Sequence, residues 1–404
     1  MAELRQNTWS LGQWYDQSVA GTTGGYKYGL EMWSWGQNNY GQLAQYNTSN
    51  PSGLSLPVQV GTVITWMWLG TGSGANRCHV IKTDGSLWCW GRNEQGCLGL
   101  NHSAPNLPGV SSPMQIGTDT TWKKVDGGEA NTVASKTDGT LWAWGWNEHG
   151  RLGQNQGSDT VYMSSPVQIG TDTTWDYVQA GRASCAAIKT DGTLWAWGYN
   201  SSGMLGFNDT VHRSSPSQIP GTNWKQGQTG YYHSLYLRTN GQLFACGNGT
   251  DGQLGKNNTT IYSSPIQIPG VWAQVDTNTS ESDPRFNLGV KTNGGLYAWG
   301  RAHTGQLGIG VGYATWARRS SPTQLPGTWR VDTNDGGQLT ISANDTCAAK
   351  KDDDTWWVWG KGSGGSLGLN EGGPAPAVTE GSPIQLPGTF DIIQTGRQNM
   401  QALR

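Results

Sequence analysis

Large apolar residues alternate with small or polar ones in short stretches along this chain, and glycine-rich turns separate the stretches. Residues 175–180 alternate in this way, and residues 184–189 form a second short apolar stretch. A third, Leu-Trp-Ala-Trp at 194–197, follows a Thr-Asp-Gly-Thr sequence at 190–193 of the kind that favours a tight hairpin. Successive side chains of a strand point to opposite faces of a sheet. The pattern therefore predicts three strands here, and residues 214–219 predict a fourth.

The same pattern returns seven times. Its clearest copy, at residues 141–153, reads Leu-Trp-Ala-Trp-Gly-Trp-Asn-Glu-His-Gly-Arg-Leu-Gly. The glycine of the Trp-Gly step recurs at intervals of 49 to 60 residues, at Gly36, Gly91, Gly145, Gly198, Gly247, Gly300 and Gly360. A period held over the whole chain indicates a repeat architecture, in which no unit buries its apolar face without a neighbour.

Four short strands per unit, repeated round a ring, predict an all-β fold: a seven-bladed β-propeller of four-stranded antiparallel blades. Six of the seven units end in Ser-Pro-x-Gln, at Pro113, Pro166, Pro216, Pro265, Pro322 and Pro383. Proline lacks an amide donor and is confined to strand starts and sheet edges, so we expect this segment to be the outermost strand.

The two ends of the chain carry complementary parts of one unit. Residues 396–404 align with 181–189 and supply an inner strand, whereas residues 32–36 supply an outer strand with only a weak partner before it. We expect them to combine into one composite blade that closes the ring, because closure removes the exposed sheet edges that invite aggregation.

The repeated Leu-Trp-x-Trp-Gly-x-Asn-x-x-Gly-x-Leu-Gly core and the downstream Ser-Pro-x-Gln-Ile-Pro-Gly resemble the repeats of the regulator of chromosome condensation family, whose members are seven-bladed propellers. The resemblance covers roughly residues 29–404 and leaves residues 1–28 as an N-terminal arm outside the ring. Members that act on chromatin carry a basic tail, and the plant UV-B photoreceptor of this fold carries a Gly-Trp-Arg-His-Thr repeat. This chain has neither, so neither function is expected.

Charge and hydropathy narrow the range of partners. Charged residues make up only 13% of the chain, the formal net charge is −2, and there is no block of Lys and Arg, so no nucleic-acid partner is expected. No stretch approaches the roughly 20 apolar residues that a membrane helix needs. Residues 1–17 lack an apolar run, so we expect no secretory signal in this segment and no membrane insertion. We expect the protein to be made in a cytoplasm.

Most of the 23 tryptophans occupy repeat slots and are expected to pack between blades, but a few aromatic residues fall outside this plan. Trp146 and Tyr199 share one slot of adjacent units, and Tyr231 and Tyr232 lie in a nearby loop of the repeat. Other copies of that slot carry Gln37, Arg92, Asn248, Arg301 and Lys361. Since the slot requires no aromatic residue, these four and Trp316 are candidate binding residues; the alternative is ordinary loop packing.

No catalytic or metal-binding pattern emerges, so neither an enzymatic activity nor a cofactor or metal is expected. The six histidines are scattered, and His233 is interpreted as structural because it lies beside a small-residue slot of its blade. The six cysteines form no Cys-x-x-Cys pair or zinc spacing and are interpreted as buried structural thiols. Residues 352–354, three consecutive aspartates, align with a hairpin turn rather than with a metal loop.

The N-terminal arm has no counterpart inside the ring. It carries Trp9, Trp14 and Tyr15 in a short polar segment, and three such rings are costly to leave in water. We therefore expect the arm to dock these residues against the ring or in a partner. This opening, joined to repeats rich in Asn and Trp, resembles tail-associated and other virion proteins of marine bacteriophages.

Two hypotheses of different classes follow. The first is a non-enzymatic bacteriophage virion protein of the tail or a fibre, structural or receptor-binding, whose partners are other virion proteins and a host-surface glycan or protein. The second is a soluble cellular or secreted protein-binding propeller that acts as a scaffold or inhibitor. Fold alone does not choose between them, because propellers host many functions.

Overall fold

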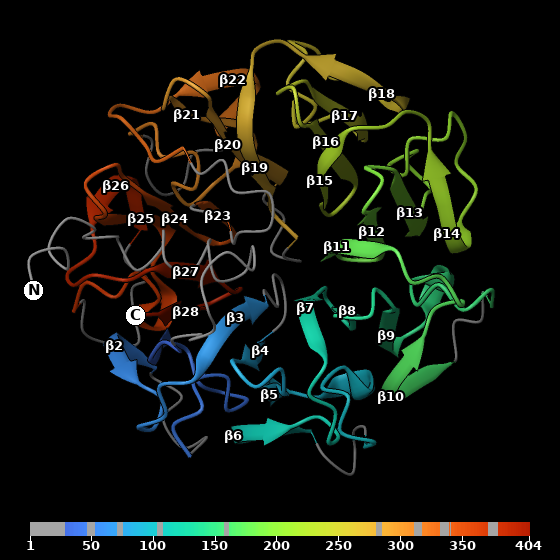
Figure 1. Cartoon of the computed structure of the whole chain (residues 1–404). Coiled ribbons are helices and arrows are strands. Elements are labelled where there is room, and N and C mark those ends of the chain that lie inside the picture. Colours follow the sequence, from blue (N-terminus) through green and yellow to red (C-terminus); the bar gives the residue numbers. More distant parts are fainter. Residues whose placement is uncertain are drawn as a thin grey trace, which may run out of the picture.

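The computed structural model describes residues 29–46, 53–70, 76–102, 108–156, 161–279, 285–310, 317–331, 339, 341–370 and 379–404. Within these ranges, seven four-stranded antiparallel sheets stand around a central axis like the blades of a propeller (Figure 1). The predicted all-β, seven-bladed fold is confirmed. The helices of the described ranges are three short 3-10 turns, η1 (Glu94–Gly96), η2 (Glu148–Gly150) and η3 (Ser363–Gly365).

Six blades each take four consecutive strands, ordered from the axis to the rim. Blades one and two are β3 (Trp66–Gly70), β4 (Arg77–Lys82), β5 (Leu87–Arg92) and β6 (Gly109–Gln115), then β7 (Trp122–Gly127), β8 (Asn131–Lys136), β9 (Leu141–Trp146) and β10 (Tyr162–Gln168). Blades three and four are β11 (Trp175–Ala180), β12 (Ser184–Lys189), β13 (Leu194–Gly198) and β14 (Arg213–Ile219), then β15 (Trp224–Thr229), β16 (His233–Arg238), β17 (Leu243–Gly247) and β18 (Tyr262–Ile268). Blades five and six are β19 (Trp272–Thr277), β20 (Arg285–Lys291), β21 (Leu296–Ala302) and β22 (Ala317–Gln324), then β23 (Ile341–Ala343), β24 (Thr346–Lys350), β25 (Trp356–Lys361) and β26 (Thr379–Gln385).

The seventh blade is composite, as the repeat alignment predicts. Its order is β27 (Ile392–Thr395), β28 (Asn399–Leu403), β1 (Met32–Gly36) and β2 (Leu54–Gln59), so strands from both ends of the chain form one sheet. β28 and β1 pair in antiparallel register from Met32 opposite Leu403 to Gly36 opposite Asn399. Two further backbone bonds, from the amide of Glu31 to the carbonyl of Arg404 (2.8 Å) and back (3.0 Å), extend the pairing. The ends of the ring are thus held by a strand ladder.

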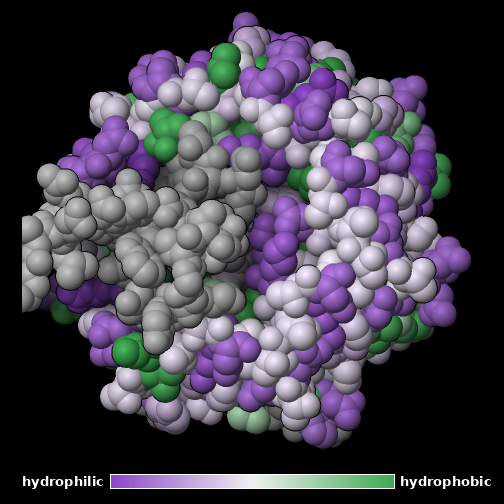
Figure 2. Space-filling model, viewed as in Figure 1, coloured by the Kyte–Doolittle hydropathy of each residue, from purple (hydrophilic) through white to green (hydrophobic). Residues whose placement is uncertain are grey.

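The expected strand order inside a unit is also confirmed. In blade three the four expected segments are β11 to β14, and Pro216 lies in β14, the outermost strand. β13 pairs with β12 on one side and with β14 on the other, so both of its edges are hydrogen-bonded within the blade. Figure 2 shows hydrophilic and intermediate residues over most of the described part of one disc face, with hydrophobic ones scattered among them.

The second tryptophan of each Trp-x-Trp-Gly motif joins neighbouring blades. Trp144 is fully buried, and its Nε1 donates a hydrogen bond to the carbonyl oxygen of Cys97 in blade one (3.0 Å). The same bond recurs at 2.8–3.1 Å from Trp35 to Ser366, Trp90 to Gln42, Trp197 to Arg151, Trp299 to Gln253 and Trp359 to Gln306. The last glycine of the motif leaves room for the ring, since a Cβ at Gly99 would lie 2.9 Å from Trp144 Nε1. Recurrence of Trp and Gly in the motif therefore reflects packing between blades.

Blade four departs from this rule and compensates for it. Cys246 stands in the tryptophan slot, and its thiol lies 3.1 Å from the carbonyl oxygen of Met204 in blade three. The space of the missing indole is taken by Tyr236, which is fully buried and donates its hydroxyl to the same carbonyl (3.3 Å). Tyr236 comes from β16, where the equivalent positions of other blades carry Ala187 and Gly289.

The cysteines and the aspartate run behave as predicted. All six cysteines are buried and free, and burial raises the pKa of the Cys185 thiol to about 12, which suppresses the reactive thiolate. Asp353 accepts hydrogen bonds from the amide (3.0 Å) and hydroxyl (2.5 Å) of Thr355 and so closes the β24–β25 hairpin. Among the described residues, no group of three or more His, Cys, Asp or Glu side chains is placed to hold a metal ion.

Neighbouring inner strands are joined by polar side chains at one repeated position. Asp126 accepts a hydrogen bond from the amide of Ala180 in the next blade (2.8 Å), and Gln179 accepts one from the amide of Thr229 (2.9 Å). Asp276 does the same for the amide of Ala343 (2.7 Å). Burial raises the pKa of Asp276 to about 7, and the charge of Asp126 adds to this, while the amides of Ala343 and Thr277 oppose it.

The junction between blades five and six is therefore expected to weaken as the pH rises. The folded state holds the Asp276 proton up to about pH 7, whereas the unfolded chain releases it near its ordinary pKa of 3.8, so stability falls between these values. Asp276→Asn should remove this pH dependence, because asparagine does not titrate. Relative to the wild type, the free energy of unfolding of the variant should rise by about 2 kcal/mol between pH 4 and pH 7.5. This value is smaller than the pKa shift alone implies, because Asp276 is partly exposed to solvent. Urea unfolding at the two pH values measures the difference, and an advantage that does not change with pH would contradict it.

Candidate functional site

Three of the candidate residues come together on one face of the disc. Tyr199 directly follows β13, and Tyr231 and Tyr232 directly precede β16. In every blade the end of the third strand pairs with the start of the second, as Ser184 does with Gly198, so both loops emerge at the same edge of the sheets. The ring centroids of Tyr199 and Tyr232 are 6.1 Å apart, and those of Tyr231 and Tyr232 meet edge to face at 4.3 Å. We call this surface, with the residues added below, the aromatic face.

Two histidines, which no sequence pattern singles out, complete the cluster. The His212 ring stacks on Tyr199 with a centroid distance of 5.1 Å and an interplanar angle of 23°. His149, from η2 of the neighbouring blade, lies 4.6 Å from the His212 ring and 5.0 Å from Tyr199. Both histidines stand in loops of different blades without a recurring spacing, so only their meeting in space identifies them.

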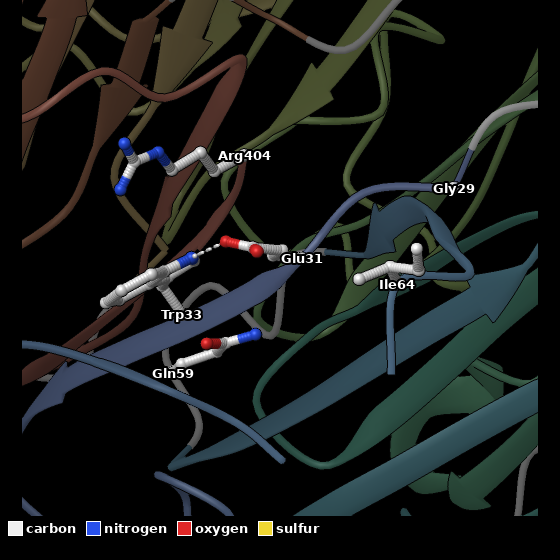
Figure 3. Close-up of a pocket in the computed structure, with 6 residues that line it drawn as sticks. All are labelled: Gly29, Glu31, Trp33, Gln59, Ile64 and Arg404. Atoms are coloured by element: carbon white, nitrogen blue, oxygen red, sulfur yellow. Dashed lines mark hydrogen bonds between the residues drawn. The ribbon is translucent and has the colours of Figure 1, made fainter. Parts of the chain in front are cut away.

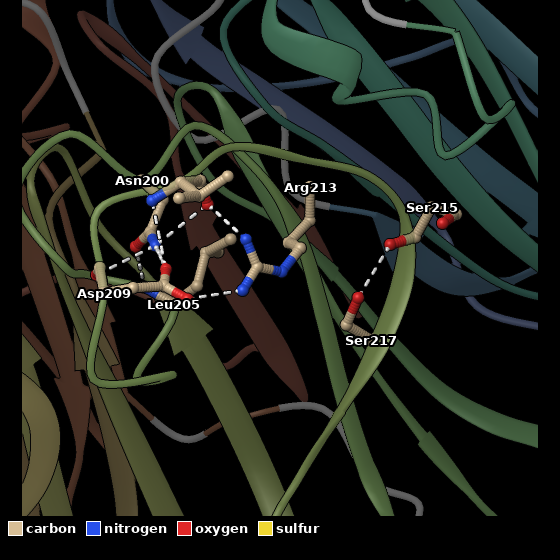
Figure 4. Close-up of polar contacts among 7 residues, drawn as sticks. Asn200, Leu205, Asp209, Arg213, Ser215 and Ser217 are labelled. Carbon is tan, nitrogen blue, oxygen red and sulfur yellow. Dashed lines mark hydrogen bonds and ion pairs between the residues drawn. The ribbon is translucent and has the colours of Figure 1, made fainter.

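The loop between β13 and β14 fixes the positions of Tyr199 and His212. The Asn200 side chain closes the loop by accepting a hydrogen bond from the amide of Leu205 (2.9 Å) and donating to Asp209 Oδ1 (3.0 Å). Arg213 reaches back to Asp209 Oδ2 (2.6 Å), as Figure 4 shows. The backbone N–H of Asn200 donates to Nδ1 of His212 (2.9 Å), which orients the imidazole beside Tyr199. The asparagine of the repeat motif therefore shapes the loop that carries Tyr199 and His212.

The carboxylate of Asp209 remains ionised in this loop. Desolvation raises its pKa, but hydrogen bonds from the Val211 amide and the Arg213 guanidinium together bring it below its ordinary value. The loop thus keeps the Asp209–Arg213 ion pair at neutral pH, and this pair helps to hold Tyr199 and His212 in place.

Trp146 continues the aromatic face into blade two. Its ring stacks on Tyr162 at 6.2 Å and 23°, and the guanidinium of Arg151 lies 4.8 Å from the ring centroid. Arg151 also forms an ion pair with Glu148, whose other oxygen lies 3.7 Å from Nε2 of His149. Trp146 is therefore linked to the histidines through the polar contacts of Arg151 and Glu148. Tyr162 is 51% exposed and offers this end of the face to solvent.

Arginines frame the other end of the cluster. The Arg182 guanidinium lies 4.0 Å from the centroid of the Tyr231 ring and is paired with Glu129 (2.8 Å). Arg285 lies 5.2 Å from the Tyr232 ring. Desolvation raises the pKa of Tyr231 to about 12, although the charge of Arg182 opposes the shift, so its phenol stays a hydrogen-bond donor at neutral pH.

A buried carboxylate pairs with three arginines of blade five. Asp251 is 3% exposed and pairs with Arg285 (3.0 Å), Arg301 (3.2 Å) and Arg318 (3.1 Å). Arg301 occupies in blade five the slot that Trp146 and Tyr199 occupy in blades two and three. The aromatic face therefore spans four consecutive blades, from Trp146 to the arginines of blade five.

The remaining candidates lie elsewhere. Trp9, Trp14, Tyr15 and Trp316 fall outside the described residues. His233 is buried, Nε2 lies 2.6 Å from the Asn287 amide oxygen, and desolvation lowers its pKa to about 4, in agreement with a structural role. No helix in the described part of the chain has the length and apolar character to cross a membrane.

Comparison with known proteins places the fold in a family. The model of the RCC1-like domain matches residues 29–342. The ultraviolet-B receptor UVR8 of Arabidopsis thaliana is 28% identical over 345 residues, which cover 85% of this chain and 63% of the receptor. The probable E3 ubiquitin-protein ligase HERC4 of Homo sapiens is 25% identical over 195 residues, or 47% of this chain and 18% of the ligase. The chain thus spans less than two thirds of either relative.

Among solved structures, yeast RCC1 (Prp20) with Kap60 bound has the same fold. Its TM-score is 0.75 at 17% identity, and the match covers 93% of this chain and 89% of that one. At this identity the likeness concerns the arrangement of blades and not the residues of the aromatic face.

Proposed function

This chain belongs to the RCC1-like domain family, and we propose that it is a non-catalytic interaction propeller that binds a partner protein through its aromatic face. The observation that carries the proposal is the contact of Tyr199, Tyr232, His149 and His212 across three blades. A propeller needs tryptophans between its blades but does not need stacked rings on a disc face. In support, yeast RCC1 was solved with another protein, Kap60, bound to it.

The composition of the face suits protein recognition. Tyrosine, tryptophan and arginine dominate the residues that contribute most to protein–protein binding, because their large rigid groups bury much area at a small entropic cost. Here the rings of Tyr199, Tyr231 and Tyr232 are half-buried and are held in place by Arg182 and by the Asn200 loop, so binding costs little further ordering of these side chains.

Replacing Tyr199 with alanine is expected to weaken partner binding by about 2 kcal/mol, or roughly 30-fold in Kd, because the ring lies at the centre of the face. Tyr199→Phe should keep most of the affinity, since stacking on His212 does not need the hydroxyl. Calorimetric titration with the partner measures both variants.

The partner is first identified with a photo-crosslinking amino acid at position 232, compared with the same group at position 240. Asn240 is exposed in the hairpin turn at the other end of the same blade, so it tests the opposite disc face. Crosslinking at both positions with equal yield would contradict a role of the aromatic face in binding.

The setting that we propose is a bacteriophage virion, in which the arm of residues 1–28 anchors the propeller through Trp9, Trp14 and Tyr15 and the aromatic face meets a host-surface protein or glycan. The resemblance of the opening segment to phage tail-associated proteins and the uncharged polar composition support this setting. Cryo-electron microscopy of particles from the native source tests it. Density for the propeller on a tail or capsid is expected, and a free monomer absent from every particle would favour the soluble scaffold instead.

A further inference from the structure

An open hollow of about 540 Å³ lies at the seam of the composite blade, away from the aromatic face. Figure 3 shows its lining: Gly29, Glu31, Trp33, Gln59, Ile64 and Arg404. In the other six blades, a hairpin turn joins the second strand to the third at this edge. In the composite blade the equivalent strands, β28 and β1, end and begin there without being joined. The hollow therefore marks the place of the missing hairpin.

The aromatic packing at this edge is looser in the composite blade than in its neighbours. Each other blade places a cation from the end of its second strand over the first aromatic ring of its third strand. The distance to the ring centroid is 3.5–4.2 Å for the five lysines in this position and 5.0 Å for the arginine, Arg238 on Phe244. At the seam the corresponding distance, from Arg404 to Trp33, is 5.7 Å. Trp33 thus keeps part of its ring accessible from the hollow.

Polar groups surround this ring. The Glu31 carboxylate accepts a hydrogen bond from Nε1 of Trp33 (3.1 Å) and forms no ion pair with Arg404 within 4.0 Å, although the two residues lie opposite each other at the seam. Gln59 pairs with Trp33 on the neighbouring strand, and its side-chain amide makes no hydrogen bond to another described residue. The Trp33 ring is therefore surrounded by one carboxylate, one guanidinium and one amide, and the two charges cancel.

We propose that this hollow binds a pyranose unit of a glycan. The apolar C–H face of a sugar packs on an indole, and its hydroxyls donate to the Glu31 carboxylate and accept from the Arg404 guanidinium, while Gln59 does either. The balanced charge favours a neutral ligand with many hydroxyls over a charged one, and the volume lies in the range of small-ligand sites, roughly 300–1,000 Å³. This site is separate from the aromatic face and does not depend on its proposed function.

Saturation-transfer difference NMR on the full chain tests the proposal, with the methyl glycosides of glucose, galactose, mannose and N-acetylglucosamine as probes. Saturation transfer to at least one glycoside is expected, and Glu31→Gln and Gln59→Ala should each weaken its binding about tenfold, the value of one lost hydrogen bond. The matched control is Gln218→Ala, since Gln218 pairs with Trp195 as Gln59 pairs with Trp33.

Three results would overturn the site: no transfer to any of the four glycosides, binding unaffected by both seam variants, or equal loss in the Gln218→Ala control. Tyr199→Ala should leave glycoside binding unchanged. The two proposals can therefore fail separately: loss of partner binding tests the aromatic face, and loss of glycoside binding tests the hollow. Thermal unfolding of each variant shows whether a loss of binding reflects a loss of folding.

Discussion

Deletion of residues 399–404 is expected to abolish the cooperative unfolding of the propeller. The deletion removes β28, which lies between β27 and β1, so the composite blade loses its central ladder and both ends of the ring are released. Unpaired strands β1 and β27 then expose backbone groups and apolar side chains, among them Met32 and Ile393, which are fully buried in the intact ring. Circular dichroism during heating, with size-exclusion chromatography, measures the loss.

A milder substitution in the same strand distinguishes the loss of ring closure from a general loss of stability. Leu403 is fully buried in the same strand, and Leu403→Ala should cost about 2–5 kcal/mol while the ladder remains. A deletion variant that melts at the wild-type temperature would show that the remaining six blades stand without the latch.

Trp144→Ala is expected to destabilise the ring by about 3–5 kcal/mol. The indole is fully buried between blades, packs edge to face against Trp122 (6.0 Å) and donates a hydrogen bond to the carbonyl of Cys97. Alanine leaves a cavity and removes this bond, so that the carbonyl keeps only its bond from the Thr132 hydroxyl (2.9 Å). Trp142→Ala, two residues earlier, is the matched control because that ring is only half-buried. Guanidinium unfolding of the two variants should give the larger loss for Trp144, and equal losses would contradict the role of the slot in joining blades.

Blade four permits the reverse experiment. Cys246→Trp alone should destabilise the protein, because Tyr236 already fills the space of the indole. Adding Tyr236→Ala should recover part of that stability, since other blades combine tryptophan in the slot with a small residue in the neighbouring strand, as at Ala187 and Trp197. A double variant less stable than both single ones would show that the two positions do not share one space.

Much of the fold was predictable because the repeat displays its own packing rules. A slot that carries tryptophan in most units must be buried in all of them, and the alignment of residues 396–404 with 181–189 predicted which strands share the composite blade. The bonds between inner strands were not predictable in this way. The same bond to a backbone amide of the next blade is accepted by aspartate at Asp126 and Asp276 and by glutamine at Gln179. Because the residue type varies, the repeat pattern does not reveal the position.

The candidate site was predictable only where a residue breaks the pattern. Tyr199 was noticed because its slot takes unrelated residues elsewhere, and Tyr231 and Tyr232 because they lie in a nearby loop. His149 and His212 break no pattern, and their meeting depends on the angle between adjacent blades, which a linear repeat does not encode. Trp146 shares its repeat slot with Tyr199, but Arg151 and Glu148 stand between its ring and the histidines.

The strand ladder that closes the ring also determines how the molecule responds to tension. β1 begins and β28 ends at the same edge of the composite blade, beside Glu31 and Arg404. A load applied between these two points acts perpendicular to the strands. Their hydrogen bonds therefore break one after another, as in a zipper, instead of bearing the force together. A load of this kind therefore opens the ring at the seam, whereas a hairpin turn such as residues 190–193 is joined covalently to both of its strands.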